Sequence, residues 1–173
     1  MRIYNYIKLF IFIAFSILLF VFRKELIAHI NYFVGSLVLV FGLESLIVLS
    51  IAQKRRSIRS IKFSFSIFEM VLGLTIITAV TDFSHVCVMW AVWSLLRQSI
   101  DIHEVLRGEV IGVVAIIYVI QSIVSIVFSI ILIINPTEHH AITHIYLLIA
   151  ELLVIALPPV VDELFLNLKK KRH

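Results

Sequence analysis

The sequence predicts an all-α integral membrane protein with six transmembrane helices, built as three repeated helical hairpins with both termini in the cytoplasm. Three observations predict this fold class. Of the 173 residues, 61% are hydrophobic and only 15% are charged, whereas soluble domains are about 45–50% apolar and about 25% charged. The apolar residues form six long segments, and most basic residues fall on one side of them. A water-soluble globule and a disordered chain are therefore both excluded.

The first three predicted helices cover residues 4–22, 27–52 and 61–80. Each approaches the ~20 apolar residues that a helix needs to cross ~30 Å of hydrocarbon. Charged clusters follow the first two, Arg23-Lys24-Glu25 and Lys54-Arg55-Arg56. The first segment has no small-x-small cleavage site before its charged end, so we expect it to be retained as an anchor rather than removed as a signal peptide.

The last three predicted helices cover residues 83–100, 110–134 and 141–161. The fourth segment is the weakest, because a charge and an amide lie inside it, and the fifth is the clearest. The sixth carries Pro158-Pro159, which should break or kink it. All six are predicted as helices, because open strand edges cannot be satisfied in lipid and no alternating barrel pattern is visible. Together they form a single transmembrane domain over residues 1–173.

The basic residues predict the orientation. With six spans and a cytoplasmic N-terminus, all but two of the 15 basic residues fall on the inner side, and only Arg23 and Lys24 fall outside. This asymmetry is the one that the positive-inside rule describes. It explains the net charge of +4 without a nucleic-acid partner. Contacts with anionic lipid headgroups are expected at Lys54, Arg55, Arg56, Arg59, Lys169, Lys170, Lys171 and Arg172.

A weak internal repeat predicts the hairpins. The runs Phe15-Ser16-Ile17-Leu18-Leu19 and Phe128-Ser129-Ile130-Ile131-Leu132 lie near the ends of the first and fifth segments. A polar residue recurs in the returning segments at Glu44, Gln98 and Glu151, at intervals of about 55 residues. The simplest account is three hairpins that pair segments one with two, three with four, and five with six.

Three stretches carry a family resemblance: Ile133-Ile134-Asn135-Pro136 before a short turn, the returning segment 33–46, and the tryptophan-containing segment 90–98. They resemble the HdeD-like membrane proteins, which are small six-span bacterial proteins built of hairpin repeats. Some members are associated with acid resistance. The resemblance implies a place in the bacterial cytoplasmic (inner) membrane and a role in acid or stress response, and it supplies no catalytic residues.

Five polar side chains within the apolar segments are the candidate intramembrane sites. Ionisable groups in hydrocarbon are costly and point to function by default. They would relay protons or hold a cation. The alternative is that each hydrogen-bonds a neighbouring helix and stabilises the bundle. The sequence leaves both open for Glu44, Glu69, Gln98, Gln121 and Glu151.

Most of the histidines are predicted at or near the outer face. A free imidazole has a pKa of ~6.5, so protonation near pH ~5–6 would make that face positive, which suits a pH sensor. His140 and His144 are also four residues apart on one helix face, as in zinc sites, which leaves a metal site open. The third interpretation is hydrated polar residues beside short loops. The residues concerned are His29, His85, His139, His140 and His144.

The sequence contains no Walker loop, nucleophile elbow or Rossmann fingerprint, and its single cysteine, Cys87, excludes an intrachain disulfide. We therefore expect a non-enzymatic membrane protein without a cofactor, acting in acid or stress response or as an accessory to other membrane components. One alternative is a small transporter or channel subunit with Glu69, Gln121 and Glu151 along a polar path. Another is an enzyme acting on lipid. The expected partners are the bilayer and a second copy or another membrane protein, and no nucleic acid.

Overall fold

The computed structural model describes residues 2–51, 56–108 and 112–170, and over these residues the chain is all-helical. No strand occurs in the described residues, so the all-α prediction is confirmed there. The helices in chain order are α1 (Arg2–Val21), α2 (Arg23–Ala28), α3 (Ile30–Ile51), α4 (Arg56–Ala79), α5 (Phe83–Leu106), α6 (Val113–Ile134) and α7 (Glu138–Lys170).

Six long helices correspond to the six predicted segments, and the short helix α2 is an addition. It occupies the charged stretch that the sequence predicts as a turn. The last helix also differs from its prediction, because α7 runs to Lys170 and is not broken at Pro158-Pro159. Each proline removes one N–H donor from the helix, and the residues after the pair keep theirs. The helix can therefore continue beyond the pair.

Three of the described helices are long and apolar enough to cross a membrane by length and composition. The spans are Ile30–Ile47 in α3, Lys62–Ala79 in α4 and Val114–Ile134 in α6. Leu9–Val21 of α1 is a shorter apolar stretch. These helices are consistent with an integral membrane protein.

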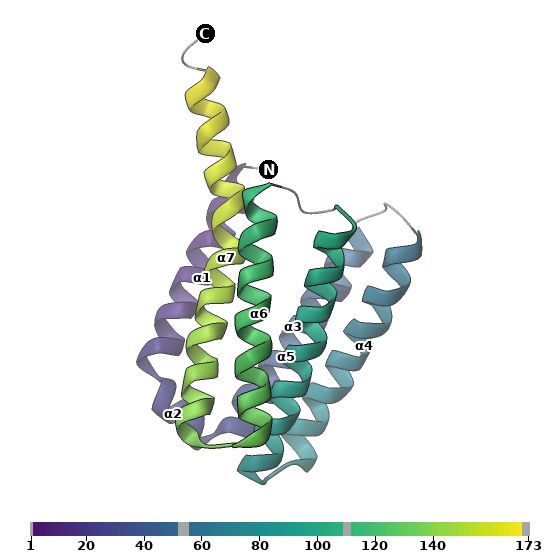
Figure 1. The fold of residues 1–173 in the computed structure, drawn as a ribbon, viewed down its shortest axis with the longest axis vertical. Coiled ribbons are helices and arrows are strands. Elements are labelled where there is room, and N and C mark those ends of the chain that lie inside the picture. The colour runs from purple at the N-terminus through teal and green to yellow at the C-terminus, as the bar shows by residue number, and fades with distance from the viewer. Residues whose placement is uncertain (1, 52–55, 109–111, 171–173) are drawn as a thin grey trace.

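The six long helices run alternately in opposite directions within one bundle (Figure 1). α1 begins and α7 ends at the same end of the bundle, which we call the inner end. The other end, which we call the outer end, holds α2 and the short turns before α5 and α7 (Figure 1). The last turns of α7 project beyond the bundle at the inner end.

The closest helix pairs are not the predicted hairpins. α3 packs most extensively along α4, α5 along α6, and α1 along α7. Of the predicted pairs, α6 and α7 also pack closely, whereas the backbones of α4 and α5 come close at few positions. The bundle is therefore organised by contacts between successive hairpins and by closure of the first helix on the last.

Glycines bring α3 and α4 together. A Cβ atom added at Gly35 would lie 2.8 Å from the backbone oxygen of Gly73, and one added at Gly42 would lie 2.9 Å from the backbone oxygen of Ser66. Backbones approach this closely only where no side chain intervenes. Gly35 and Gly42 therefore allow the close approach of α3 and α4.

Replacing Gly73 by alanine is expected to destabilise the bundle. The new Cβ atom would lie 2.7 Å from the backbone oxygen of Gly35 and 2.8 Å from the backbone nitrogen of Leu39, so the two backbones must move apart. Overpacking of this kind costs about 1–3 kcal/mol. Thermal unfolding in detergent measures it, and Ser64→Ala, at an exposed position of the same helix, should change stability by less than ~0.5 kcal/mol. Equal effects of the two substitutions would contradict the close-packing account.

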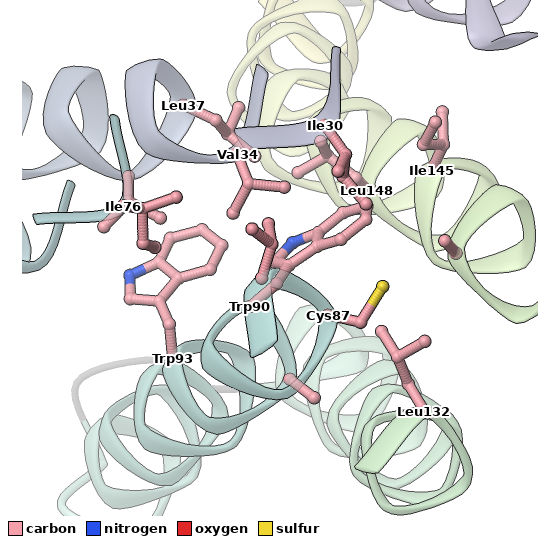
Figure 2. Packing of buried hydrophobic residues seen from close by; sticks show 14 of the residues in the cluster. Ile30, Val34, Leu37, Ile76, Cys87, Trp90, Trp93, Leu132, Ile145 and Leu148 are labelled. Carbon is pink, nitrogen blue, oxygen red and sulfur yellow. The ribbon is translucent and has the colours of Figure 1, made fainter. Parts of the chain in front are cut away.

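The core is formed mainly by α3, α5 and α7. Trp90 of α5 is 1% exposed and lies among Val34, Ile30 and Leu148 in Figure 2, with its ring edge-on to Phe33 at 5.8 Å. Cys87 is fully buried in the same cluster, as expected for a small apolar residue. Trp90 therefore serves helix packing.

The peripheral helices α1, α4 and α6 present large apolar side chains outward. On a soluble protein an exposed apolar surface of this extent would mark a binding face, whereas for a membrane protein it is the surface that lipid covers. The exposed residues include Phe10, Ile13, Ile17 and Phe20 on α1, Phe63, Ile67, Val71 and Leu74 on α4, and Ile116, Ile120, Ile123, Val127 and Ile130 on α6.

Candidate functional site

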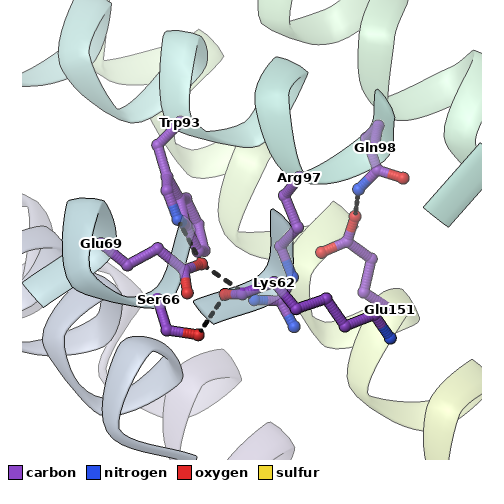
Figure 3. Close-up of polar contacts among 7 residues, drawn as sticks. All are labelled: Lys62, Ser66, Glu69, Trp93, Arg97, Gln98 and Glu151. Atoms are coloured by element: carbon purple, nitrogen blue, oxygen red, sulfur yellow. Dashed lines mark hydrogen bonds and ion pairs between the residues drawn. The ribbon is translucent and has the colours of Figure 1, made fainter. Parts of the chain in front are cut away.

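The polar side chains predicted within the apolar segments mostly turn into the bundle. Glu69 of α4 and Gln98 of α5 are buried, and Gln121 of α6 and Glu151 of α7 are partly buried. Figure 3 shows Glu69, Gln98 and Glu151 in one region where α4, α5 and α7 face one another. Glu44 differs, because it lies exposed on the surface of α3.

Glu69 joins α4 to α5. Its Oε1 accepts a hydrogen bond from Trp93 Nε1 at 2.9 Å and lies 3.3 Å from Arg97 Nη1. Trp93 and Arg97 are four residues apart, so both side chains leave the same face of α5. The Arg97 guanidinium also stacks over the Phe41 ring, 4.0 Å from its centroid. The Glu69 carboxyl is thus held by a buried ion pair and an indole donor.

Glu151 joins α7 to both α5 and α6. Gln98 Nε2 donates to Glu151 Oε1, and Ser125 Oγ donates to the same oxygen at 3.1 Å. The Gln121 side chain also interacts with this carboxyl. Ser122, Ser125 and Ser129 recur at helical spacing and are buried, so α6 presents a hydroxyl-lined face toward α7.

Charged side chains continue from this region to the inner end. Arg97 lies between the Glu69 and Glu151 carboxyls (Figure 3) and interacts electrostatically with both. Asp101, one turn further along α5, interacts with Arg97 and with Lys62. Lys62 of α4 forms an ion pair with Glu104 of α5 near the surface. The polar region therefore reaches from the middle of the bundle toward its inner end.

Several buried polar atoms have no hydrogen-bond partner among the described residues. They include Glu69 Oε2, Gln98 Oε1 and Gln121 Oε1. A buried acceptor without a partner costs about 1–3 kcal/mol. Three carboxyls described in this region, those of Glu69, Asp101 and Glu151, interact electrostatically with the same Arg97 guanidinium. The arrangement can therefore take up protons or water, because neutral carboxylic acids and water would satisfy these atoms.

His144 is the buried one of the five candidate histidines. It is 4% exposed, with its Nε2 3.2 Å from Ser129 Oγ and its ring 5.0 Å from that of Trp90. It lies six residues into α7, which is a depth of ~9 Å along the helix, and it faces α6. His140 instead directs its Nδ1 to the Asn135 backbone oxygen at 2.7 Å. The two rings do not form the pair expected of a zinc site.

The other four candidate histidines lie at the outer end. His29, His85 and His139 are exposed, and His140 is half-buried. His85 Nδ1 lies 2.9 Å from Asp82 Oδ2. Among the described residues, no three His, Cys, Asp or Glu side chains are grouped so as to hold a metal ion. The outer end thus places exposed imidazoles beside its short connections.

Asp82 caps α5 and should make its start sensitive to acid. Its carboxylate accepts a hydrogen bond from the His85 backbone N–H at 3.0 Å, and this bond chiefly lowers the pKa of Asp82. The carboxylate therefore stabilises the fold above pH ~4, and this contribution is lost as pH falls through the folded-state pKa. Asp82→Asn keeps a capping oxygen without the charge. The melting temperature of wild type should exceed that of Asp82→Asn at pH ~6, and the gap should close by pH ~2.5. An unchanged gap would contradict the assignment.

Sequence reasoning missed two parts of the site. The sequence places Arg97 only among the inner-side basic residues and Trp93 only in a tryptophan-containing segment, yet both bind Glu69. Their spacing of four residues within one apolar segment was the available signal. Ser125 and Ser129 were seen as parts of a repeat or not at all, although their helical spacing marks a polar face on α6.

Four of the eight residues predicted to contact headgroups belong to helices that the structure describes. The backbones of Arg56 and Arg59 in α4 and of Lys169 and Lys170 in α7 belong to the inner ends of their helices. Their side chains are not among those described. Lys54, Arg55, Lys171 and Arg172 lie outside the described residues.

No protein-family model matches the chain, and neither a curated protein nor a solved structure matches it.

Proposed function

We propose that the chain is a non-enzymatic, six-span protein of the bacterial cytoplasmic membrane. In this proposal α1, α3, α4, α5, α6 and α7 each cross the bilayer, and both termini lie in the cytoplasm. The alternating helix directions and the outward apolar faces of α1, α4 and α6 support six crossings. The basic residues support the orientation.

The observation that carries a non-enzymatic role is the way the interior polar groups are used. Glu69 and Glu151 each bind side chains of neighbouring helices, Glu69 on α5 and Glu151 on α5 and α6. Such contacts stabilise helix association, and they do not present a nucleophile beside a base as an enzyme site would. The network is therefore assigned first to holding the bundle together.

The proposed role is in acid or stress response, with a second copy or another membrane protein as partner. It rests on the resemblance to HdeD-like proteins and on the histidines at the outer end, because histidine is the residue type that pH sensors use. Survival at low pH tests it. A strain lacking the gene should survive acid challenge less well than its parent, and the plasmid-borne gene should restore survival. Equal survival of the deletion strain and its parent would contradict the role.

A small transporter or channel subunit is the second candidate. One observation favours it: the interior carboxyls of Glu69, Asp101 and Glu151 outnumber the Arg97 guanidinium among the described side chains of this region. Uncompensated charge is costly in a low-dielectric interior, so such a site exchanges protons readily with its surroundings.

A further inference from the structure

We propose that the protein conducts protons across the membrane along a file of polar side chains between α5, α6 and α7. The proposal rests on the six-span arrangement and develops the second candidate function by naming the ion and its route. From the outer end inward, the file consists of His144, Ser129, Ser125, Glu151 and Asp101.

The outer half of the file is the His144–Ser129 pair. His144 is 4% exposed and lies ~6 Å along α7 from His140, which is at the outer turn. An imidazole accepts a proton on one ring nitrogen and releases one from the other. Ser129 Oγ, at 3.2 Å from Nε2, passes the proton on by donating its own hydrogen and accepting another.

Glu151 is the central carrier. Ser125 lies one turn inward of Ser129 on α6, a rise of ~6 Å, which one bridging water can span. A proton delivered through Ser125 converts the Glu151 carboxylate into a carboxylic acid. Because Arg97 already pairs with Glu69, Glu151 is the less compensated of the two carboxyls. Glu151 is therefore the carboxyl placed to load a proton from Ser125 and to release it inward.

The inner half begins at two unpaired acceptors. Gln98 Oε1 and Gln121 Oε1 are buried without partners among the described residues, and both side chains touch the Glu151 carboxyl. Water bound to these oxygens would take the proton from Glu151, which returns to a carboxylate. Asp101 lies three residues after Gln98 on the same face of α5 and interacts with Glu151. From Asp101 the Lys62–Glu104 pair leads to the inner surface.

A proton fits this file better than a metal cation. Gln98 Nε2 and Ser125 Oγ both turn hydrogens toward Glu151 Oε1. Because these two donors occupy lone pairs of Oε1, that oxygen is poorly placed to bind a metal cation, which needs lone pairs directed at it. Each step moves one proton and no electrons, and the pH gradient across the membrane supplies the driving force.

Flux into vesicles tests the proposal. Purified full-length protein is reconstituted into liposomes containing a pH-sensitive dye, with a potassium gradient and valinomycin to balance charge. Wild type should acidify the lumen at least tenfold faster than protein-free vesicles. Glu151→Gln should lose at least nine-tenths of this rate, and Ser129→Ala most of it. Glu44→Gln is the matched control, because this carboxyl lies exposed on α3 away from the file, and it should conduct like wild type.

The possible outcomes distinguish failure of the proton route from failure of the six-span arrangement. Wild-type vesicles no faster than empty ones, or Glu151→Gln at the wild-type rate, would overturn the proton file. Flux that needs sodium and vanishes without it would replace the proton by a metal cation. If Glu151→Gln does not fold, the Ser129→Ala variant alone tests the proton route, because it removes only one hydroxyl oxygen and should leave the fold intact. Labelling introduced cysteines on both sides of the same vesicles reports the six-span arrangement independently of flux.

Discussion

Replacing Arg97 by leucine lowers the free energy of unfolding by about 3–5 kcal/mol, the usual cost of removing one partner of a buried ion pair. The substitution leaves the Glu69 carboxyl, whose side chain is fully buried, with the Trp93 indole as its one remaining donor among the described residues. It also removes the guanidinium that stacks on Phe41. Denaturant unfolding in detergent micelles measures the change.

Two further variants isolate the cause. The double variant Glu69→Gln with Arg97→Leu removes both charges and keeps an oxygen for Trp93 Nε1, so it should regain most of the lost stability. Arg107→Leu replaces an exposed arginine at the end of the same helix and should cost less than ~0.5 kcal/mol. A double variant as unstable as Arg97→Leu alone would show that the ion pair is not the source.

The second large effect is expected at Trp90. Truncation to alanine should cost about 3–5 kcal/mol, because a buried indole leaves a cavity that the helices cannot fully close. Trp90 is 1% exposed and contacts Phe33 of α3 and His144 of α7, so its loss loosens all three central helices. Within lipid this penalty is lost packing rather than lost hydrophobic burial.

Phe10→Ala is the control for Trp90→Ala. Phe10 is also a large aromatic residue, but it is 74% exposed on α1, so truncation leaves no interior cavity. Its melting temperature should stay close to that of wild type while that of Trp90→Ala falls. Similar losses for both would contradict the placement of Trp90 at the centre of the bundle.

The existence of the helices was predictable, because apolar length alone specifies them in lipid. Which helices pack against each other was not predictable. Leucine, isoleucine and valine recur on every face, so the sequence carries little information on which helices touch, and the close packing of α1 on α7 has no local signal. The glycine contact was an exception, since Gly35 and Gly42 mark a face that tolerates close approach.

The candidate site was likewise predictable only in part. That Glu69 and Glu151 need partners followed from their place in apolar segments, whereas the identity of those partners depends on helix rotation. Glu44 has the same sequence signature and yet lies exposed, because its face of α3 turns outward. The burial of His144 was not predictable for the related reason that distance from a loop says nothing about the side of the helix.

Six membrane crossings are the central claim, and cysteine labelling tests them most directly. In a Cys87→Ala background, Lys24→Cys and Glu138→Cys place thiols at the outer end, and Arg107→Cys places one at the inner end, all at exposed positions. In intact cells a membrane-impermeant maleimide should label positions 24 and 138 and should reach position 107 only after permeabilisation. Labelling of position 107 in intact cells, or protection of position 24 or 138, would contradict the six-span account.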